Sequence, residues 1–197
     1  MGKRRLEAAL QRYGEQHPDA EQPAVRWLPF QLNPDLPESG IPRAEYIRRK
    51  FGSRGRGSYD RVTAVGTTVG ISFAFDNIQV QPNTLNAHRL MHFAEQKGAQ
   101  DAVAEALFRA YFIDGANITD SDVLADVAAV AGLEGKAVKA YLASEDDREL
   151  IAGADAEARS AGISGVPFFI FNGRIGVSGA QDAEVLLQAM EQAAAEE

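Results

Sequence analysis

Cysteine is absent from this sequence of 197 residues. Its absence excludes disulfide bonds, thiolate ligands for a metal ion and a cysteine nucleophile supplied by this chain. Histidine is scarce, with three residues. His88 and His92 lie on one side of a predicted helix, but they have no third ligand at a usual metal-binding spacing. We therefore predict no metal site.

Long apolar runs are lacking as well. No stretch approaches the ~18 apolar residues that are needed to cross a bilayer. The N-terminal region also lacks the apolar segment of a secretory signal peptide. We therefore expect a cytoplasmic protein without a membrane partner.

Basic residues are outnumbered, because 20 Lys and Arg against 28 Asp and Glu give a formal net charge of −8 at pH 7. An acidic chain is repelled by a phosphate backbone, so we expect no nucleic-acid partner. The Arg-Gly repeat within residues 52–58 is too short to change this expectation. The length suits one domain, or one domain that carries an insertion.

Residues 2–16 are predicted to form a helix, with an apolar stripe of Leu6, Ala9, Leu10 and Tyr13. Lys3, Arg4 and Arg5 stand at its beginning, where the positive end of the helix dipole disfavours cations. Either a solvated helix start tolerates a mismatch of about 1 kcal/mol, or these residues belong to the middle of a longer helix whose first turns are missing.

Residues 24–30 are rich in large and β-branched side chains and predict a strand. Pro29 cannot donate a backbone hydrogen bond, so this should be an edge strand. A proline-rich loop follows. Residues 43–51 are then predicted to form a short basic helix, and residues 52–58 a mobile link.

Residues 60–160 are predicted to be mostly helical, with no strong strand. Asn83 or Thr84 can cap the first long helix, and Thr119 with Asp122 resembles a capping box for the third. The predicted helices are 85–97, 100–112, 120–131, 135–143 and 147–161.

The pattern changes after this block. Residues 166–171 are apolar on both faces, which predicts a strand covered by helices on each side. Asn172-Gly173 is a strong hairpin signal, so residues 174–177 should return antiparallel. A last helix over 181–194 should pack through Val185, Leu186, Ala189 and Met190. The order of elements predicts an α/β fold with a helical domain inserted between the halves of one sheet.

Four motifs carry a family resemblance: 27–34 (WLPFQLNP), 49–52 (RKFG), 83–90 (NTLNAHRL) and 162–170 (GISGVPFFI). Together they resemble the FrnE-like branch of the DsbA family, which is related to 2-hydroxychromene-2-carboxylate isomerases and kappa-class glutathione transferases. The resemblance implies a thioredoxin-like fold. Residues 1–58 and 162–197 would form a discontinuous thioredoxin-like domain, and residues 59–161 the inserted helical domain.

The chain departs from this family at its start. Members begin with a strand and a Cys-Pro-Trp-Cys turn, and both are absent here, so the resemblance implies an N-terminally truncated fold. The family's first strand would lie between residues 24–30 and the strand at 166–171. Without it their buried backbone groups would be unpaired, at about 1–3 kcal/mol each. We interpret the start as a misassigned initiation codon, or alternatively as a truncation.

The resemblance implies a thiol–disulfide oxidoreductase or isomerase scaffold whose Cys-x-x-Cys motif is absent, so we expect no dithiol activity from this chain. The substrate, a protein dithiol, a disulfide or an extended peptide, would bind at Val166, Pro167, Phe168, His88 and Asn83. Pro167 would be cis and would leave the Val166 backbone free for strand addition. Alternatively, Pro167 only begins the strand, His88 is a hydrogen-bonded helix histidine and Asn83 is a helix cap.

We expect no cofactor for the oxidoreductase scaffold. Two further functions remain open. One of the two is a glutathione-dependent isomerase or transferase, in which Gly179, Ala180 and Gln181 would bind glutathione. The alternative at that position is a plain helix cap. The other is a non-catalytic peptide-binding module. An unpaired sheet interior would also favour a homo-oligomer, and the sequence leaves the oligomeric state open.

Overall fold

The computed structural model describes residues 1–52, 57 and 59–195. Most of the link predicted at 52–58 lies outside these residues. The described helices are α1 (Gly2–Gln16), α2 (Arg43–Phe51), α3 (Asp60–Thr67), the 3-10 helix η2 (Phe75–Asn77), α4 (Leu85–Glu95), α5 (Gln100–Phe112), α6 (Ser121–Val130), α7 (Gly135–Ala143), α8 (Arg148–Ser160) and α9 (Ala183–Ala195). The strands are β1 (Ile41–Pro42), β2 (Val80–Gln81), β3 (Phe168–Phe171) and β4 (Ile175–Ser178).

The predicted helices are confirmed, several of them to the residue. The predicted bounds of α1, α2, α5 and α7 are those of the structure, and α4 ends two residues early. In the described part of the chain, no helix is both long and apolar enough to cross a membrane.

The predicted hairpin is also confirmed. β3 and β4 pair antiparallel, with Phe168 opposite Ser178 and Phe171 opposite Ile175. Asn172 and Gly173 both have positive φ, +49° and +68°, as a type I′ turn requires. A second small sheet, β1 with β2, was not predicted, because its two-residue strands are too short to leave a pattern.

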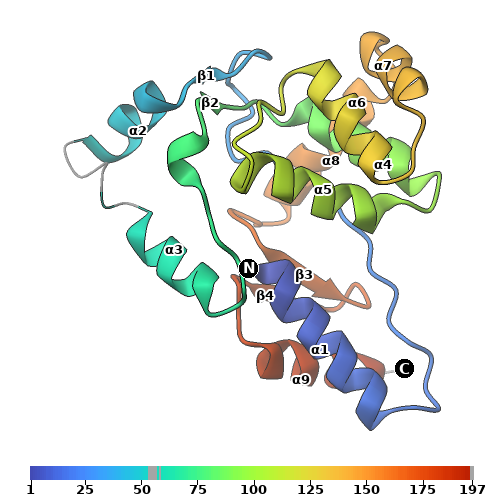
Figure 1. Ribbon diagram of the computed structural model, residues 1–197. Coiled ribbons are helices and arrows are strands. Elements are labelled where there is room, and N and C mark those ends of the chain that lie inside the picture. Colours follow the sequence, from blue (N-terminus) through green and yellow to red (C-terminus); the bar gives the residue numbers. More distant parts are fainter. Residues whose placement is uncertain (53–56, 58, 196–197) are drawn as a thin grey trace.

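The strand predicted at 24–30 is wrong, since the structure has a coil there (blue in Figure 1). Strand-forming residues become a strand only when a neighbouring backbone completes the ladder. Within the described residues, β3 and β4 form a two-stranded sheet that does not include this segment. Side chains of α4 and α5 form hydrogen bonds with the segment instead.

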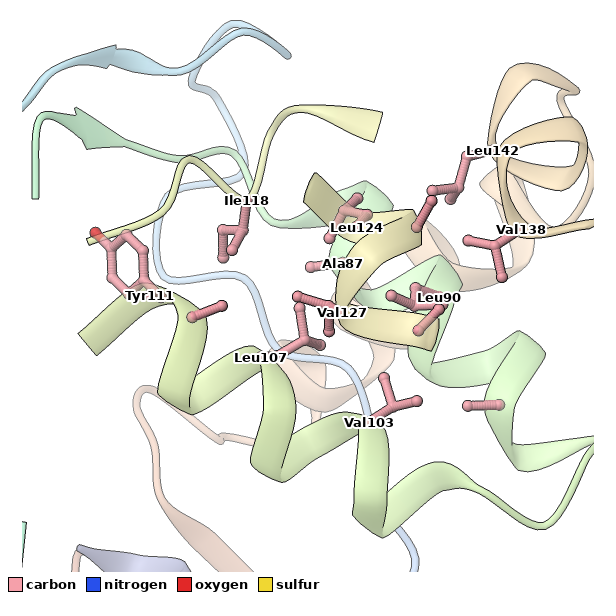
Figure 2. Packing of buried hydrophobic residues seen from close by; sticks show 14 of the residues in the cluster. Ala87, Leu90, Val103, Leu107, Tyr111, Ile118, Leu124, Val127, Val138 and Leu142 are labelled. Carbon is pink, nitrogen blue, oxygen red and sulfur yellow. The ribbon is translucent and has the colours of Figure 1, made fainter. Parts of the chain in front are cut away.

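Buried apolar side chains form two separate clusters. One lies among α4 to α7, where Leu90, Val103 and Leu124 are fully buried and point toward one another (Figure 2). The other joins α1 to α9 and includes Leu6, Tyr13, Leu186, Leu187 and Met190. Phe169 and Phe171 of β3 pack on this second cluster. The hairpin therefore packs with one face against α1 and α9 (Figure 1).

Three finer expectations are corrected. β3 is not covered on both faces, because α1 and α9 cover the Phe169 side while Ile170 is 48% exposed. Val185 does not pack inward, because it lies one residue off the buried stripe and is exposed, and Leu187 is buried instead. The cap of α6 is not Thr119: the Asp120 carboxylate accepts the hydrogen bond from the Asp122 N–H at 2.8 Å.

Candidate functional site

The Val-Pro loop meets the N-terminal end of α1. The Val166–Pro167 peptide bond is cis. A Cβ atom on Gly2 would lie 2.8 Å from Pro167 Cγ and 3.3 Å from Phe169 Cζ. Such an approach leaves no room for a side chain at position 2. The first turn of α1 and the loop before β3 are therefore in direct contact, although they come from opposite ends of the sequence.

β3 presents an unpaired edge next to this contact. The Gly179 N–H donates to the Pro167 carbonyl at 2.8 Å, which continues the register of the hairpin. Because antiparallel pairs alternate, Phe169 and Phe171 direct their backbone groups toward β4, and Phe168 and Ile170 direct theirs the other way. No other described strand pairs with that edge. An extended chain could add there, next to Val166, which is 49% exposed.

Positive charge collects at the same end of α1. Lys3 Nζ lies 3.2 Å from Asp101 and 3.3 Å from Glu105. Arg4 donates to both carboxylate oxygens of Glu105, and Arg5 lies 3.1 Å from Asp182. The unexpected cations of the first turn are therefore stabilised by ion pairs with α5 and with the residue before α9.

Burial, and then the nearby Arg4 and Arg5, lower the pKa of the Met1 amino group. Hydrogen bonds from Arg4 lower the pKa of Glu105. Arg4 contributes to both shifts, after burial in the case of Met1, and its charge together with the helix dipole favours an anion such as a thiolate at this helix end.

The beginning of α5 binds the coil that contains Trp27. The Gln100 side chain accepts from the Trp27 N–H at 2.9 Å and donates to the Trp27 carbonyl at 3.0 Å. The Trp27 indole donates to Asp101 at 3.1 Å. Sequence analysis missed Gln100, Asp101 and Glu105. The spacing of the two acidic residues, four apart on one helix face, was the only available signal.

His88 binds the same coil further along. Its Nε2 lies 3.2 Å from the Phe30 carbonyl, so this nitrogen donates. Burial lowers the pKa of His88, although the Phe30 hydrogen bond and the charge of Asp155 oppose this shift. Asp155, which is buried, accepts from the Gln31 N–H at 2.6 Å.

Asn83 combines two contacts. Its Oδ1 accepts from the Leu85 N–H at 2.9 Å, and its Nδ2 donates to the Leu36 carbonyl at 2.8 Å. It thus caps α4 and holds the proline-rich loop. These recorded bonds tie His88 and Asn83 to residues 30–36, so their contact with a substrate stays a prediction.

The region of Gly179, Ala180 and Gln181 is already partly bonded. The Gly179 N–H is used by Pro167, and the Gln181 N–H donates to the Gly179 carbonyl at 2.9 Å. Arg5 donates to the Ala180 carbonyl. Beside this segment is an open cavity of about 550 Å³, lined by Arg4, Arg5, Ala8, Arg12, Thr68, Val69, Asp182, Ala183 and Glu184.

Metal binding has no support in the side chains that the structure describes. His92 approaches Glu95 through Nδ1 and Asp147 through Nε2, at 3.7 Å in each case, so the two carboxylates face different nitrogens of the ring. No group of three or more His, Cys, Asp or Glu residues able to hold a metal ion occurs among the described residues.

Comparison with known proteins decides the family. A family model described as the DsbA-like thioredoxin domain matches residues 1–191. The chain belongs to the DsbA-like thioredoxin family. This DsbA-like protein is also similar in structure to a probable DsbA oxidoreductase from Streptomyces coelicolor, with a TM-score of 0.86 and 30% identity, over 100% of this chain and 84% of that one. The predicted α/β, thioredoxin-like fold is confirmed.

A curated relative adds similarity without a known activity. The DsbA-like chain is 26% identical over 171 residues to the uncharacterized protein YwbO of Bacillus subtilis. The match covers 84% of this chain and 80% of the relative.

Proposed function

We propose that this protein is the scaffold of a thiol–disulfide oxidoreductase or isomerase of the FrnE-like branch. The backbone of the cis Val166–Pro167 loop binds an extended peptide, whereas the open edge of β3 is the place for the absent first strand. A dithiol of the Cys-x-x-Cys type, which residues 1–197 do not contain, acts at the N-terminal end of α1. We also propose that the protein is cytoplasmic and that its partner is a protein dithiol or disulfide.

The contact between Gly2 and Pro167 is the observation that carries the proposal. It brings the helix end that stabilises a thiolate next to the loop that can hold a peptide backbone. In thiol–disulfide exchange, the thiolate attacks one sulfur of the substrate disulfide and the other sulfur leaves as a thiolate. A nucleophile at the start of α1 would reach a disulfide bound at the Val166–Pro167 loop.

The open edge of β3 supports the position of the missing strand. Phe168 and Ile170 direct backbone groups away from β4, toward the side where the family resemblance puts its first strand. Trp27 and Gln31, on the far side of that position, use side chains of Gln100 and Asp155 as hydrogen-bond partners. A strand that ends at the start of α1 would lie between these two segments.

The proposal can be tested by adding a strand and a Cys-x-x-Cys motif before Met1. The 197-residue chain should not reduce insulin above the uncatalysed rate. A chain extended before Met1 by a β-strand and Cys-Pro-Trp-Cys should reduce it, and the same extension with Ser-Pro-Trp-Ser should not. The proposal is wrong if the cysteine extension is no faster than its serine control. Binding of unfolded peptide without turnover by the cysteine extension would instead indicate the non-catalytic module.

Glutathione binding is the second candidate, favoured by the cavity beside Gly179, Ala180 and Gln181. The guanidinium groups of Arg4 and Arg5 line it and could bind a carboxylate of the tripeptide. Calorimetric titration of the chain with glutathione tests this candidate. Binding at millimolar or lower dissociation constant supports it, and absence of heat at those concentrations excludes it.

A further inference from the structure

α5 directs two acidic side chains at the beginning of α1. Glu105 binds Arg4 through both guanidinium nitrogens and lies 3.3 Å from Lys3 Nζ. Asp101, one turn earlier on α5, lies 3.2 Å from the same nitrogen. The Lys3 side chain is only 9% exposed, so its charge is held in a fixed place. The helical block therefore supplies counter-charges for Lys3 and Arg4, in addition to Glu7 of α1 itself, which pairs with both.

These acids oppose the electrostatic effect of the cations they bind. At position 1, Arg4 and Arg5 lower the pKa of the amino group, whereas Glu105 and Glu7 raise it. The same charges shift the pKa of a thiol at this position in the same directions, because Arg4 and Arg5 attract the thiolate and Glu105 repels it. The net potential at the helix end depends on this balance, and of the two acids Glu105, on α5, acts more strongly than Glu7 of α1 itself.

We propose that Glu105, assisted by Asp101, is a positioning residue that sets the electrostatic potential at the N-terminal end of α1 and thereby the acidity of a thiol held there. It acts through Lys3 and Arg4, which it orients and partly neutralises. The inference rests on the proposed function, because it assumes that a thiol works at this helix end. It adds that the helical block controls the reactivity of that thiol.

A single reporter cysteine tests the proposal without any substrate. Met1→Cys, in a chain that continues from a cleavable N-terminal tag, places the only thiol of the protein at the start of α1. Its pKa follows from the pH dependence of alkylation and should lie below the usual ~8.5. Adding Glu105→Gln should lower this thiol pKa further by about 0.5 unit, and the difference should shrink in ~1 M salt.

Matched variants separate this effect from a general change in charge. Glu184→Gln removes the same charge opposite Arg12, two turns further along α1, and should shift the thiol pKa much less. Glu105→Asp keeps the charge and should leave the thiol pKa close to that of the Met1→Cys parent. Lys3→Met removes a cation and should raise the thiol pKa, which provides a test of opposite sign.

The proposal is overturned if Glu105→Gln leaves the thiol pKa unchanged or raises it, or if Glu184→Gln shifts it equally. A failure of the Cys-Pro-Trp-Cys extension to reduce insulin would overturn the proposed function but would leave these thiol pKa differences intact. Conversely, an active extension whose thiol pKa does not respond to Glu105 would overturn only this inference.

Discussion

Gln100 binds both backbone groups of Trp27, its Oε1 accepting at 2.9 Å and its Nε2 donating at 3.0 Å. A single amide side chain thus makes the pair of hydrogen bonds that a neighbouring strand would make. The coil that contains Trp27 is held in place although no described strand lies beside it.

Replacing Gln100 with alanine should destabilise the protein by about 1–3 kcal/mol, because two partly buried backbone groups lose their partners. Urea unfolding measures this loss. The emission of Trp27, the one tryptophan of the sequence, should also shift to longer wavelength. The exposed Gln188→Ala on α9 should change neither quantity, and an equal loss in both variants would contradict the role assigned to Gln100.

Gly2→Ala should destabilise the protein by about 1–3 kcal/mol, because the new Cβ would lie 2.8 Å from Pro167 Cγ. Peptide binding at the Val-Pro loop should weaken as well. Gly153→Ala in α8, where an added Cβ has open space, should stabilise by about 0.5–1 kcal/mol. Thermal unfolding of the two variants gives the comparison, and a tolerated Gly2→Ala would argue against the tight contact.

Asp120→Ala should reduce the unfolding free energy by about 0.5–2 kcal/mol through loss of the cap of α6. The adjacent Thr119→Ala should have a smaller effect, because the Thr119 hydroxyl bonds to Asn117 rather than to the helix. Denaturant midpoints of the two variants decide between the carboxylate and the hydroxyl as the cap.

The stability of the protein should decrease on acidification below pH 6.5 partly through His88. Burial lowers the pKa of this group in the folded state, so the unfolded chain takes up a proton first. The stabilisation is complete above the unfolded pKa of about 6.5 and is lost as the pH falls toward the folded pKa. His88→Gln, whose amide can still donate to Phe30, should flatten this part of the curve of unfolding free energy against pH. An unchanged slope would show that His88 does not titrate in this way.

The local elements of this protein could be predicted from sequence because their signals are local. Helix stripes gave the bounds of α2, α5 and α7, and Asn172-Gly173 gave the hairpin. The coil at 24–30 has the composition of a strand, but composition does not reveal whether a neighbouring backbone is present. Asp120 and Thr119 are adjacent residues that can both cap a helix, so only the hydrogen bond in the structure shows which of them does.

The candidate site was only partly predictable for the same reason. The Val-Pro loop was found from its motif, whereas the role of Gly2 depends on a contact between the two ends of the chain. Gln100, Asp101 and Glu105 stand on an ordinary amphipathic helix, and nothing in their local pattern indicates that they bind Trp27, Lys3 and Arg4. Contacts between side chains of different helices or strands produce no periodic pattern that a single sequence could reveal.

The two apolar clusters differ in when they can form during biosynthesis. The cluster of α4 to α7 is built from residues 78–142 and can assemble while the rest of the chain is still on the ribosome. The stripe of α1 must wait for Leu186, Leu187 and Met190 of α9, which are translated after all of the other described helices. Among the described helices, α1 is therefore translated first and covered last, and we expect nascent chains to depend on a chaperone at this helix.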